Sequence, residues 1–254
     1  MDATVRKVLA DIRSRKYSPV YFLQGEEPFY IDLISDFIET SVLSEAEKGF
    51  NQVIVYGKDA SMATILTHAR RFPMMSERQV VIVKEAQDIQ DLGKEIGAKL
   101  LLDYLSGPVP STILVFCHKH KSLDKRKELG KKIDKLALCV TTRKLYDNQL
   151  PEFVAEYVRD KKMAMDERAV SAFCEYVGND LHRLANEIDK LAIGLPVGAI
   201  ITAEMVMNQV GVSKEHNIFE LQRAIIQRDP LLANKIVNYF ESNTKKNPMI
   251  PIVA

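Results

Sequence analysis

The sequence predicts a parallel α/β fold followed by helices alone, and three observations support this prediction. Short β-branched runs alternate with amphipathic helical patterns over roughly the first 140 residues, as in a parallel sheet covered by helices. One run, Val80–Val83, is apolar throughout, which is typical of a strand buried on both faces. From Asp147 onward the helical period continues, and no strand-like alternation returns.

The first strand is predicted over Val20–Gln24 and the helix after it over Phe29–Leu43. In that helix Ile31, Ile34, Ile38 and Val42 recur at helical spacing on one side. The later strands are expected at Gln52–Tyr56, Gln79–Lys84, Thr112–Cys117 and Ala137–Thr141, with helices at about Ser61–Phe72, Asp91–Leu105 and Asp124–Leu136.

The second half is predicted to be helical. Its helices are expected at about Gln149–Lys162, Asp166–Val177, Leu181–Ile193, Ala203–Val210, Ile218–Gln227 and Pro230–Ser242. We divide the chain into an α/β domain (1–143), a small helical domain (144–212) and the start of a further helical domain (213–254). Because Ile250–Ala254 is an apolar end, we expect the last domain to be truncated.

Composition favours a soluble cytoplasmic protein. The 35 basic and 34 acidic residues nearly cancel, so any contact with nucleic acid is expected to be local. No apolar run approaches the roughly 20 residues that cross a bilayer, and the first residues do not resemble a secretory signal. The three cysteines lie far apart in apolar runs, as reduced core residues do.

The segment Gly25–Asp32 occupies the place of a phosphate-binding loop, between the first strand and the first helix. Only the first glycine of the G-x-x-x-x-G-K-[ST] pattern is present, as Gly25. Tyr30 replaces the second glycine, Ile31 the lysine and Asp32 the hydroxyl that binds magnesium. Ile31 supplies no cation, and the acids of this segment repel a triphosphate, so the loop is predicted to be degenerate.

The third strand gives a second sign of the same loss. In an ATPase of this kind the strand ends in an acid that holds magnesium, whereas here it ends in Lys84-Glu85. The alternative is an unrelated α/β fold in which the turn at Gly25 has no functional meaning.

Three large apolar side chains cluster on a predicted turn. Pro73 disfavours helix at the residue before it, so Phe72, Met74 and Met75 are placed between a helix and the buried third strand. Turns are normally at the surface, and an aromatic with two flexible thioethers suits insertion into a pocket of a partner. The alternative is that Phe72 and one methionine fold back onto the sheet.

Four segments in order resemble the delta subunit of the bacterial DNA polymerase III clamp loader. They are Val20–Phe29, the Phe72–Gln79 turn, Leu123–Lys127 and Gly178–Leu181. Gly-Glu-Glu-Pro-Phe at 25–29 is fairly specific, and the resemblance covers the whole chain.

The resemblance implies an AAA+-type α/β domain without nucleotide or other cofactor, a helical lid and a helical collar. It implies a non-catalytic subunit that binds the ring-shaped sliding clamp and holds one of its interfaces open. Its partners would be the clamp, the ATPase subunits, the delta-prime subunit and primed DNA in the assembled loader. The clamp-binding plug falls on Phe72, Met74 and Met75, although the family often has leucine and phenylalanine at the positions of the two methionines.

Two further features of the resemblance fit a subunit that senses no nucleotide. Leu181 stands where active relatives carry an arginine that senses the γ phosphate, and Arg183 follows two residues later. The Ser-Arg-Cys motif of subunits that reach into a neighbouring ATP site is absent from the chain.

A basic stretch, Lys119–Lys135, includes Lys125, Arg126 and Lys127. It could face the DNA through phosphate contacts, but such runs are more often solvated helix faces. Cys117-His118-Lys119-His120 lacks a fourth ligand for zinc and is interpreted as structural.

Two rival functions remain at this point. An atypical ATPase would have to bind ATP tightly despite Ile31 and Lys84, and an isolated DNA-binding α/β protein would need affinity for DNA without partner subunits. Nucleotide titration distinguishes the first rival, and a DNA shift assay distinguishes the second.

Overall fold

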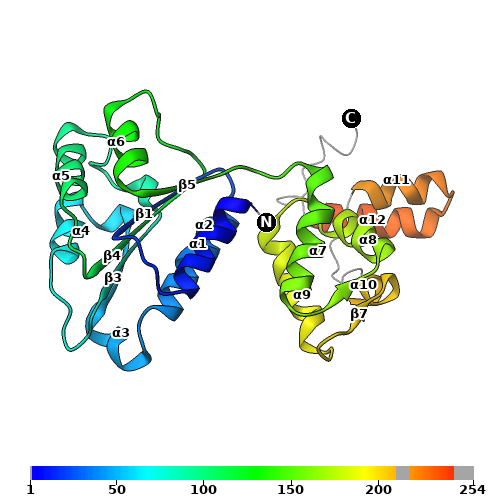
Figure 1. The fold of residues 1–254 in the computed structure, drawn as a ribbon. Coiled ribbons are helices and arrows are strands. Elements are labelled where there is room, and N and C mark those ends of the chain that lie inside the picture. Colours follow the sequence, from blue (N-terminus) through cyan, green and yellow to red (C-terminus); the bar gives the residue numbers. More distant parts are fainter. Residues whose placement is uncertain (1, 210–217, 243–254) are drawn as a thin grey trace. The chain divides into compact units, whose positions relative to one another are not determined.

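The structure is a computed structural model that describes residues 2–209 and 218–242 (Figure 1). Contacts divide the chain into two compact units, Met1–Tyr157 with Asn179–Ala185 and Val158–Gly178 with Asn186–Ala254. The predicted boundary at 212–213 and the predicted truncated end, Asn247–Ala254, lie outside the described residues. The division into three domains stays a prediction.

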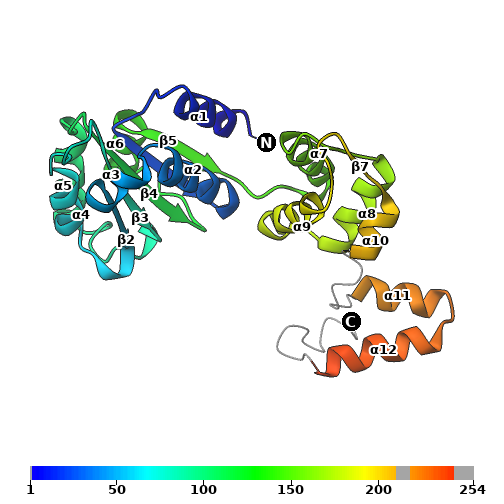
Figure 2. The ribbon, with the colours of Figure 1, turned by 90° about the horizontal axis from the view of Figure 1, so that it is seen from below.

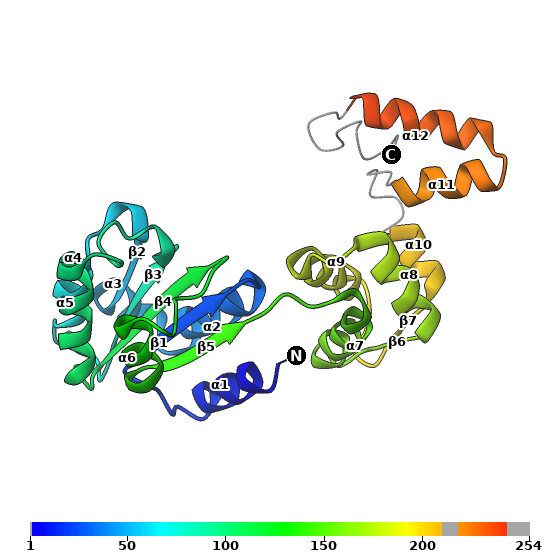
Figure 3. The same cartoon turned by 90° about the horizontal axis from the view of Figure 1, so that it is seen from above.

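The first unit is built on a five-stranded sheet with the strand order β2-β3-β4-β1-β5. All of its neighbouring strands are parallel, so the predicted fold class is confirmed. Figure 3 shows β1 lying between β4 and β5. The strands are β1 (Val20–Gly25), β2 (Gln52–Tyr56), β3 (Gln79–Lys84), β4 (Thr112–Lys119) and β5 (Leu138–Thr142), close to the predicted ranges.

Helices cover both faces of this sheet (Figure 1). One face carries α1 (Ala3–Arg13) and α2 (Pro28–Ser41), and the other carries α4 (Met62–Ala69), α5 (Glu95–Ser106) and α6 (Glu128–Leu136). A further helix, α3 (Glu45–Asn51), leads directly into β2.

The core explains why β1, β3 and β4 are so apolar. Helices pack on both sides of these inner strands, and nearly all of their residues are buried. Phe22, Val81 and Phe116 face the side of α4, α5 and α6. The long apolar strands therefore fix the centre of the sheet and the place where its carboxyl ends meet.

Some element boundaries in the first unit differ from the prediction. Neither α1 nor α3 was predicted. The helix predicted over Ser61–Phe72 ends at Ala69, because Thr112 and Gln79 bind its last carbonyl groups before Pro73 is reached. The helices expected from Asp91 and Asp124 begin at Glu95 and Glu128.

The later part of the chain is mainly helical, as predicted. Its helices are α7 (Leu150–Asp160), α8 (Glu167–Val177), α9 (Leu181–Ile193), α10 (Ala203–Gln209), α11 (Ile218–Ile226) and α12 (Pro230–Ser242). The expectation of helices alone was wrong in one detail, because β6 (Ala164–Met165) and β7 (Ile200–Ile201) pair in parallel. These strands have only two residues each, too few for a period of two to show in the sequence.

Within the second unit, α8 packs on α10, and α11 packs on α12 (Figure 2). Asp166 caps α8 by accepting a hydrogen bond from the Ala169 amide at 2.6 Å. In the part of the chain that the structure describes, no helix combines the length and the apolar character needed to span a membrane.

Candidate functional site

The topology of the sheet points to the crevice at the carboxyl ends of β1 and β4. The connection from β1 runs to β2 at one edge of the sheet, and the connection from β4 runs to β5 on the other side. Open parallel sheets bind ligands where connections leave in opposite directions. Gly25 and Lys119 are register partners at this point, so the predicted phosphate loop lies at the crevice.

Gly25 serves the packing of the sheet. Its φ is +135°, and a Cβ built on it would lie 2.1 Å from the Thr142 carbonyl oxygen. The Glu26 amide donates to that same carbonyl at 3.1 Å, and the Thr142 hydroxyl donates to the Glu27 carbonyl at 2.9 Å. The loop is therefore tied tightly to the end of β5, and only glycine fits at its first position.

The amino terminus of α2 is capped by the chain's own carboxylate. The Phe29 amide donates to Glu27 Oε1 at 3.1 Å, and Pro28 occupies the first helical position. A phosphate-binding loop places an anionic ligand at this end of the helix. Burial raises the pKa of Glu27, although the hydrogen bond from Phe29 opposes the effect.

Tyr30 and Ile31 are core residues. Both side chains are buried, and Ile31 has no exposed surface at all. The Tyr30 hydroxyl has no hydrogen-bond partner among the described residues, and burial raises the pKa of Tyr30 well above its usual range. A working phosphate loop would have a glycine and a lysine at these two positions. Here the side chains of Tyr30 and Ile31 pack α2 against the sheet instead.

Two lysines at the strand ends bind acids of the chain. Lys119 Nζ, at the end of β4, lies 2.9 Å from Asp32 Oδ1 and 3.0 Å from Glu85 Oε1. Burial lowers the pKa of Lys119, but the hydrogen bonds to these two carboxylates outweigh it and raise the pKa above its ordinary value.

Lys84 makes the corresponding contacts from the end of β3. Its Nζ lies 2.8 Å from Asp36 Oδ1 and 3.2 Å from Glu39 Oε2, both on α2. The place predicted for a magnesium-holding acid therefore carries a cation that is already paired. The crevice is filled by internal ion pairs where an ATPase of this fold would keep open charges for phosphate and metal.

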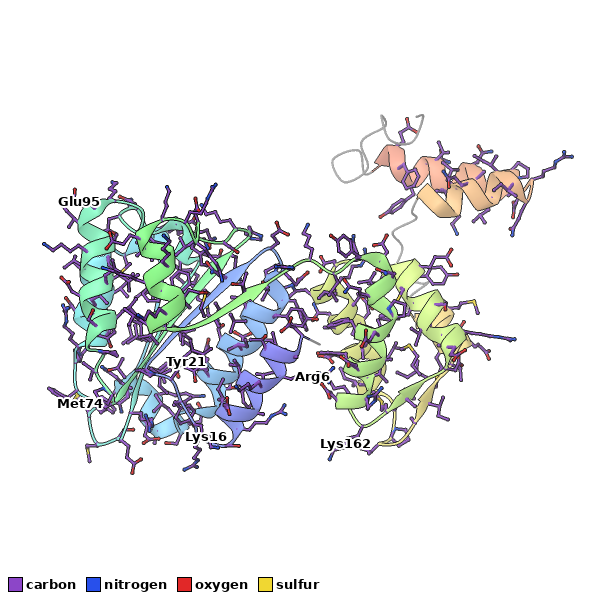
Figure 4. All side chains as sticks on the ribbon, turned by 45° about the horizontal axis from the view of Figure 1, so that its top comes forward. Arg6, Lys16, Tyr21, Met74, Glu95 and Lys162 are labelled. Carbon is purple, nitrogen blue, oxygen red and sulfur yellow. The ribbon has the colours of Figure 1, made fainter. Side chains whose placement is uncertain are left out.

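The structure brings the three predicted apolar tip residues together on one exposed turn between α4 and β3. Phe72 is 81% exposed, Met74 54% and Met75 103%, so none of them folds back onto the sheet. Met75 also has a φ of +51°, which is uncommon for a residue with a side chain. Figure 4 shows Met74 at the edge of the first unit.

The base of this turn is fixed by buried polar side chains that sequence reasoning missed. The Thr112 hydroxyl donates to the Ala69 carbonyl at 2.9 Å, and Gln79 Nε2 donates to that hydroxyl at 2.7 Å. On the other side, the Met74 amide donates to Asn51 Oδ1 at 2.6 Å. The sequence did contain a signal for this contact, because Gln79 and Thr112 are polar residues at the start of apolar strands. A polar side chain that is buried there needs a hydrogen-bond partner.

The predicted basic residues lie at the surface near the start of α6. Lys125 Nζ lies 2.8 Å from Asp134 Oδ1, and Arg126 Nε lies 3.1 Å from Asp124 Oδ1. Lys127 is exposed at the residue before the helix. Local acids neutralise part of this charge, and its role toward DNA stays a prediction.

The surroundings of the Cys117-His118-Lys119-His120 segment are those of residues that pack and hydrogen-bond within the fold. Burial raises the pKa of the Cys117 thiol to about 12. His118 is buried, with Nδ1 2.9 Å from the Lys121 carbonyl oxygen. Within residues 2–209 and 218–242, no three of the histidine, cysteine, aspartate and glutamate side chains are grouped so as to hold a metal ion.

The sheet and the filled crevice define a parallel α/β protein whose phosphate-loop position is occupied by its own side chains. Residues 21–143 match the family described as "DNA polymerase III, delta subunit". The resemblance predicted from the sequence motifs is therefore confirmed over these residues.

Two comparisons extend this resemblance over more of the chain. The chain is 27% identical over 225 residues to the DNA polymerase III subunit delta of Bacillus subtilis (strain 168), an alignment that covers 87% of this chain. It spans 65% of the length of that curated relative. The solved structure of the Bacillus subtilis DNA clamp loader delta protein matches with a TM-score of 0.76 and 25% identity. That match covers 94% of this chain and 72% of the other.

Proposed function

We propose that this chain is the clamp-loader subunit that binds the sliding clamp through the exposed turn of Phe72, Met74 and Met75, and that it holds the clamp open for loading onto primed DNA. The observation that carries the proposal is the exposure of three large apolar side chains on a turn whose base is fixed. Exposed apolar clusters on rigid supports are typical of protein-binding sites.

The filled crevice supports a role without catalysis. In an ATPase of this fold, phosphate and metal would bind in this crevice. Here the same places are occupied by internal contacts of Lys119, Lys84 and Glu27. We infer that the chain uses no nucleotide of its own and that the energy of ATP enters through the ATPase subunits of the loader. The delta-prime subunit and primed DNA would be its other partners in that assembly.

Clamp opening then follows from differential binding. A ring opens in the presence of this subunit only to the extent that the subunit binds the open form more tightly than the closed form. Burying an aromatic or a methionine side chain contributes about 1.5–3 kcal/mol, and only the part of this energy that is gained in the open form alone shifts the ring equilibrium. No chemical step on the subunit itself is needed.

A clamp carrying a pair of dyes across one of its interfaces tests the proposal. Addition of this chain without ATP is expected to separate the dyes, and the Phe72→Ala/Met74→Ala/Met75→Ala variant is expected to leave them together. Closed rings in the presence of saturating wild-type chain would overturn the opening role.

A further inference from the structure

Helix α3 contacts the exposed turn through the buried side chain of Asn51. The Met74 amide donates to Asn51 Oδ1 at 2.6 Å, and Asn51 Nδ2 donates back to the Met74 carbonyl at 2.9 Å. Asn51 Nδ2 also lies 3.2 Å from the Glu47 carbonyl oxygen within the same helix. One side-chain amide thus pairs with both polar groups of the Met74 backbone and is itself fixed by α3.

A second residue of α3, Glu47, lines one surface cavity with Met75 and Ser76 of the turn. The Glu47 carboxylate accepts hydrogen bonds from the Ser44 hydroxyl at 2.7 Å and the Ser44 amide at 2.9 Å. These hydrogen bonds lower the pKa of Glu47 to about 2. This acceptor therefore stays ionised at neutral pH.

Met75 directly follows the residue held by Asn51 and has an unusual backbone conformation. Its φ of +51° is in the left-handed region, which a residue with a Cβ avoids unless its surroundings impose it. Met74, on one side of it, is held by Asn51 of α3, and Ser76, on the other side, lines a cavity with Glu47. The consequence is a Met75 side chain that projects fully into solvent.

We infer that Asn51 is a positioning residue that holds the clamp-binding turn in its projecting conformation before the clamp arrives. This inference rests on the proposed function, because it assumes that the turn is the part that binds. A preformed turn loses less conformational freedom on binding than a flexible one, so loosening it is expected to weaken the complex without removing any contacting side chain.

Two variants of Asn51 test the inference. Asn51→Asp keeps an acceptor for the Met74 amide and loses the donor to the Met74 carbonyl, whereas Asn51→Leu removes both hydrogen bonds to Met74 at similar side-chain volume. The dissociation constant for the sliding clamp is expected to rise about 3- to 10-fold for the first and about 10-fold or more for the second. Glu45→Gln is the matched control on α3, because Glu45 bonds Lys48 and is not expected to alter the affinity.

Two further readouts separate positioning from a general loss of structure. The amide hydrogen of Met74 is expected to exchange about 10-fold faster or more in Asn51→Leu, with deep core amides of β4 unchanged. In a Met75→Ala background the effect of Asn51→Asp on the affinity is expected to shrink, because Asn51 acts through the placement of the turn that carries Met75. Asn51→Asp keeps the test available if Asn51→Leu does not fold.

The outcomes distinguish this inference from the function on which it rests. If the wild type does not bind the clamp, the proposed function fails, and exchange at Met74 still decides whether α3 holds the turn. If the wild type binds, the triple alanine variant does not, and both Asn51→Asp and Asn51→Leu bind like the wild type, the positioning role is overturned alone.

Discussion

Lys119 Nζ lies 2.9 Å from Asp32 Oδ1 in the crevice at the carboxyl ends of β1 and β4. Asp32 stands where a phosphate-binding loop would place its magnesium-binding hydroxyl, and Lys119 approaches from the neighbouring strand. Glu85 is the second partner of the same ammonium group, at 3.0 Å. The charged groups of the crevice therefore pair with one another.

Lys119→Met is expected to lower the free energy of unfolding by about 1–3 kcal/mol, because it leaves two partly buried carboxylates without their cation. Urea unfolding measures this loss. Lys125→Met is the matched control, since Lys125 forms an exposed pair with Asp134 and is expected to change stability by less than about 0.5 kcal/mol. Equal effects of the two variants would contradict a structural role for the crevice ion pairs.

Glu27→Gln is expected to stabilise the protein at pH 7 and to have little effect at pH 4. Burial raises the folded-state pKa of Glu27 above its ordinary value of 4.5. The folded state therefore binds the proton more tightly, and stability is lost as the pH rises from 4.5 through the raised pKa. Glutamine keeps an acceptor for the Phe29 amide and carries no charge.

Unfolding of wild type and Glu27→Gln at both pH values measures this effect. The neighbouring Glu26 is exposed, so Glu26→Gln is the control and is expected to show the same small difference at each pH. A Glu27→Gln variant that is less stable than the wild type at pH 7 would show that the charge of the cap matters more than its burial.

Tyr30→Phe is expected to leave the free energy of unfolding unchanged or to raise it by up to about 1 kcal/mol, since the buried hydroxyl has no partner among the described residues. Tyr104→Phe is the comparison, because the Tyr104 hydroxyl donates to the Ala69 carbonyl at 3.4 Å. Its loss is expected to cost about 0.5–1.5 kcal/mol. The prediction is wrong if Tyr30→Phe destabilises as much as Tyr104→Phe.

Neutralising Lys125, Arg126 and Lys127 in an assembled loader is expected to flatten the dependence of DNA affinity on salt, if this segment contacts phosphates. Each phosphate contact that is lost reduces the slope of log affinity against log salt by about one. An unchanged slope would show that the segment is a solvated helix face.

The sheet could be predicted because its strands carry their own signal. Runs such as Val80–Val83 are apolar along their length, and this pattern needs no knowledge of the rest of the chain. Helix α1 carries an equally clear signal that was missed, since Val5, Val8, Leu9 and Ile12 recur at helical spacing after the capping residue Asp2. Helix α3 has seven residues, too few for a convincing period.

The candidate site could be predicted in part. The exposed turn of Phe72, Met74 and Met75 could be predicted from Pro73, and the mismatch of Tyr30 and Ile31 to a phosphate-loop pattern is visible in the sequence itself. What fills the crevice and what holds the turn depend on contacts between distant segments. Lys119 meets Asp32 across 87 residues of sequence, and local patterns contain no trace of such a pair.

The most direct test of the account is the affinity of this chain for its sliding clamp without ATP. The wild type is expected to bind, and Phe72→Ala/Met74→Ala/Met75→Ala is expected to bind about 100- to 1000-fold more weakly while unfolding at the same temperature. Ile96→Ala removes an equally exposed apolar side chain on α5 and is expected to bind like the wild type. A wild type without affinity for the clamp, or a triple variant that binds equally well, would contradict the account.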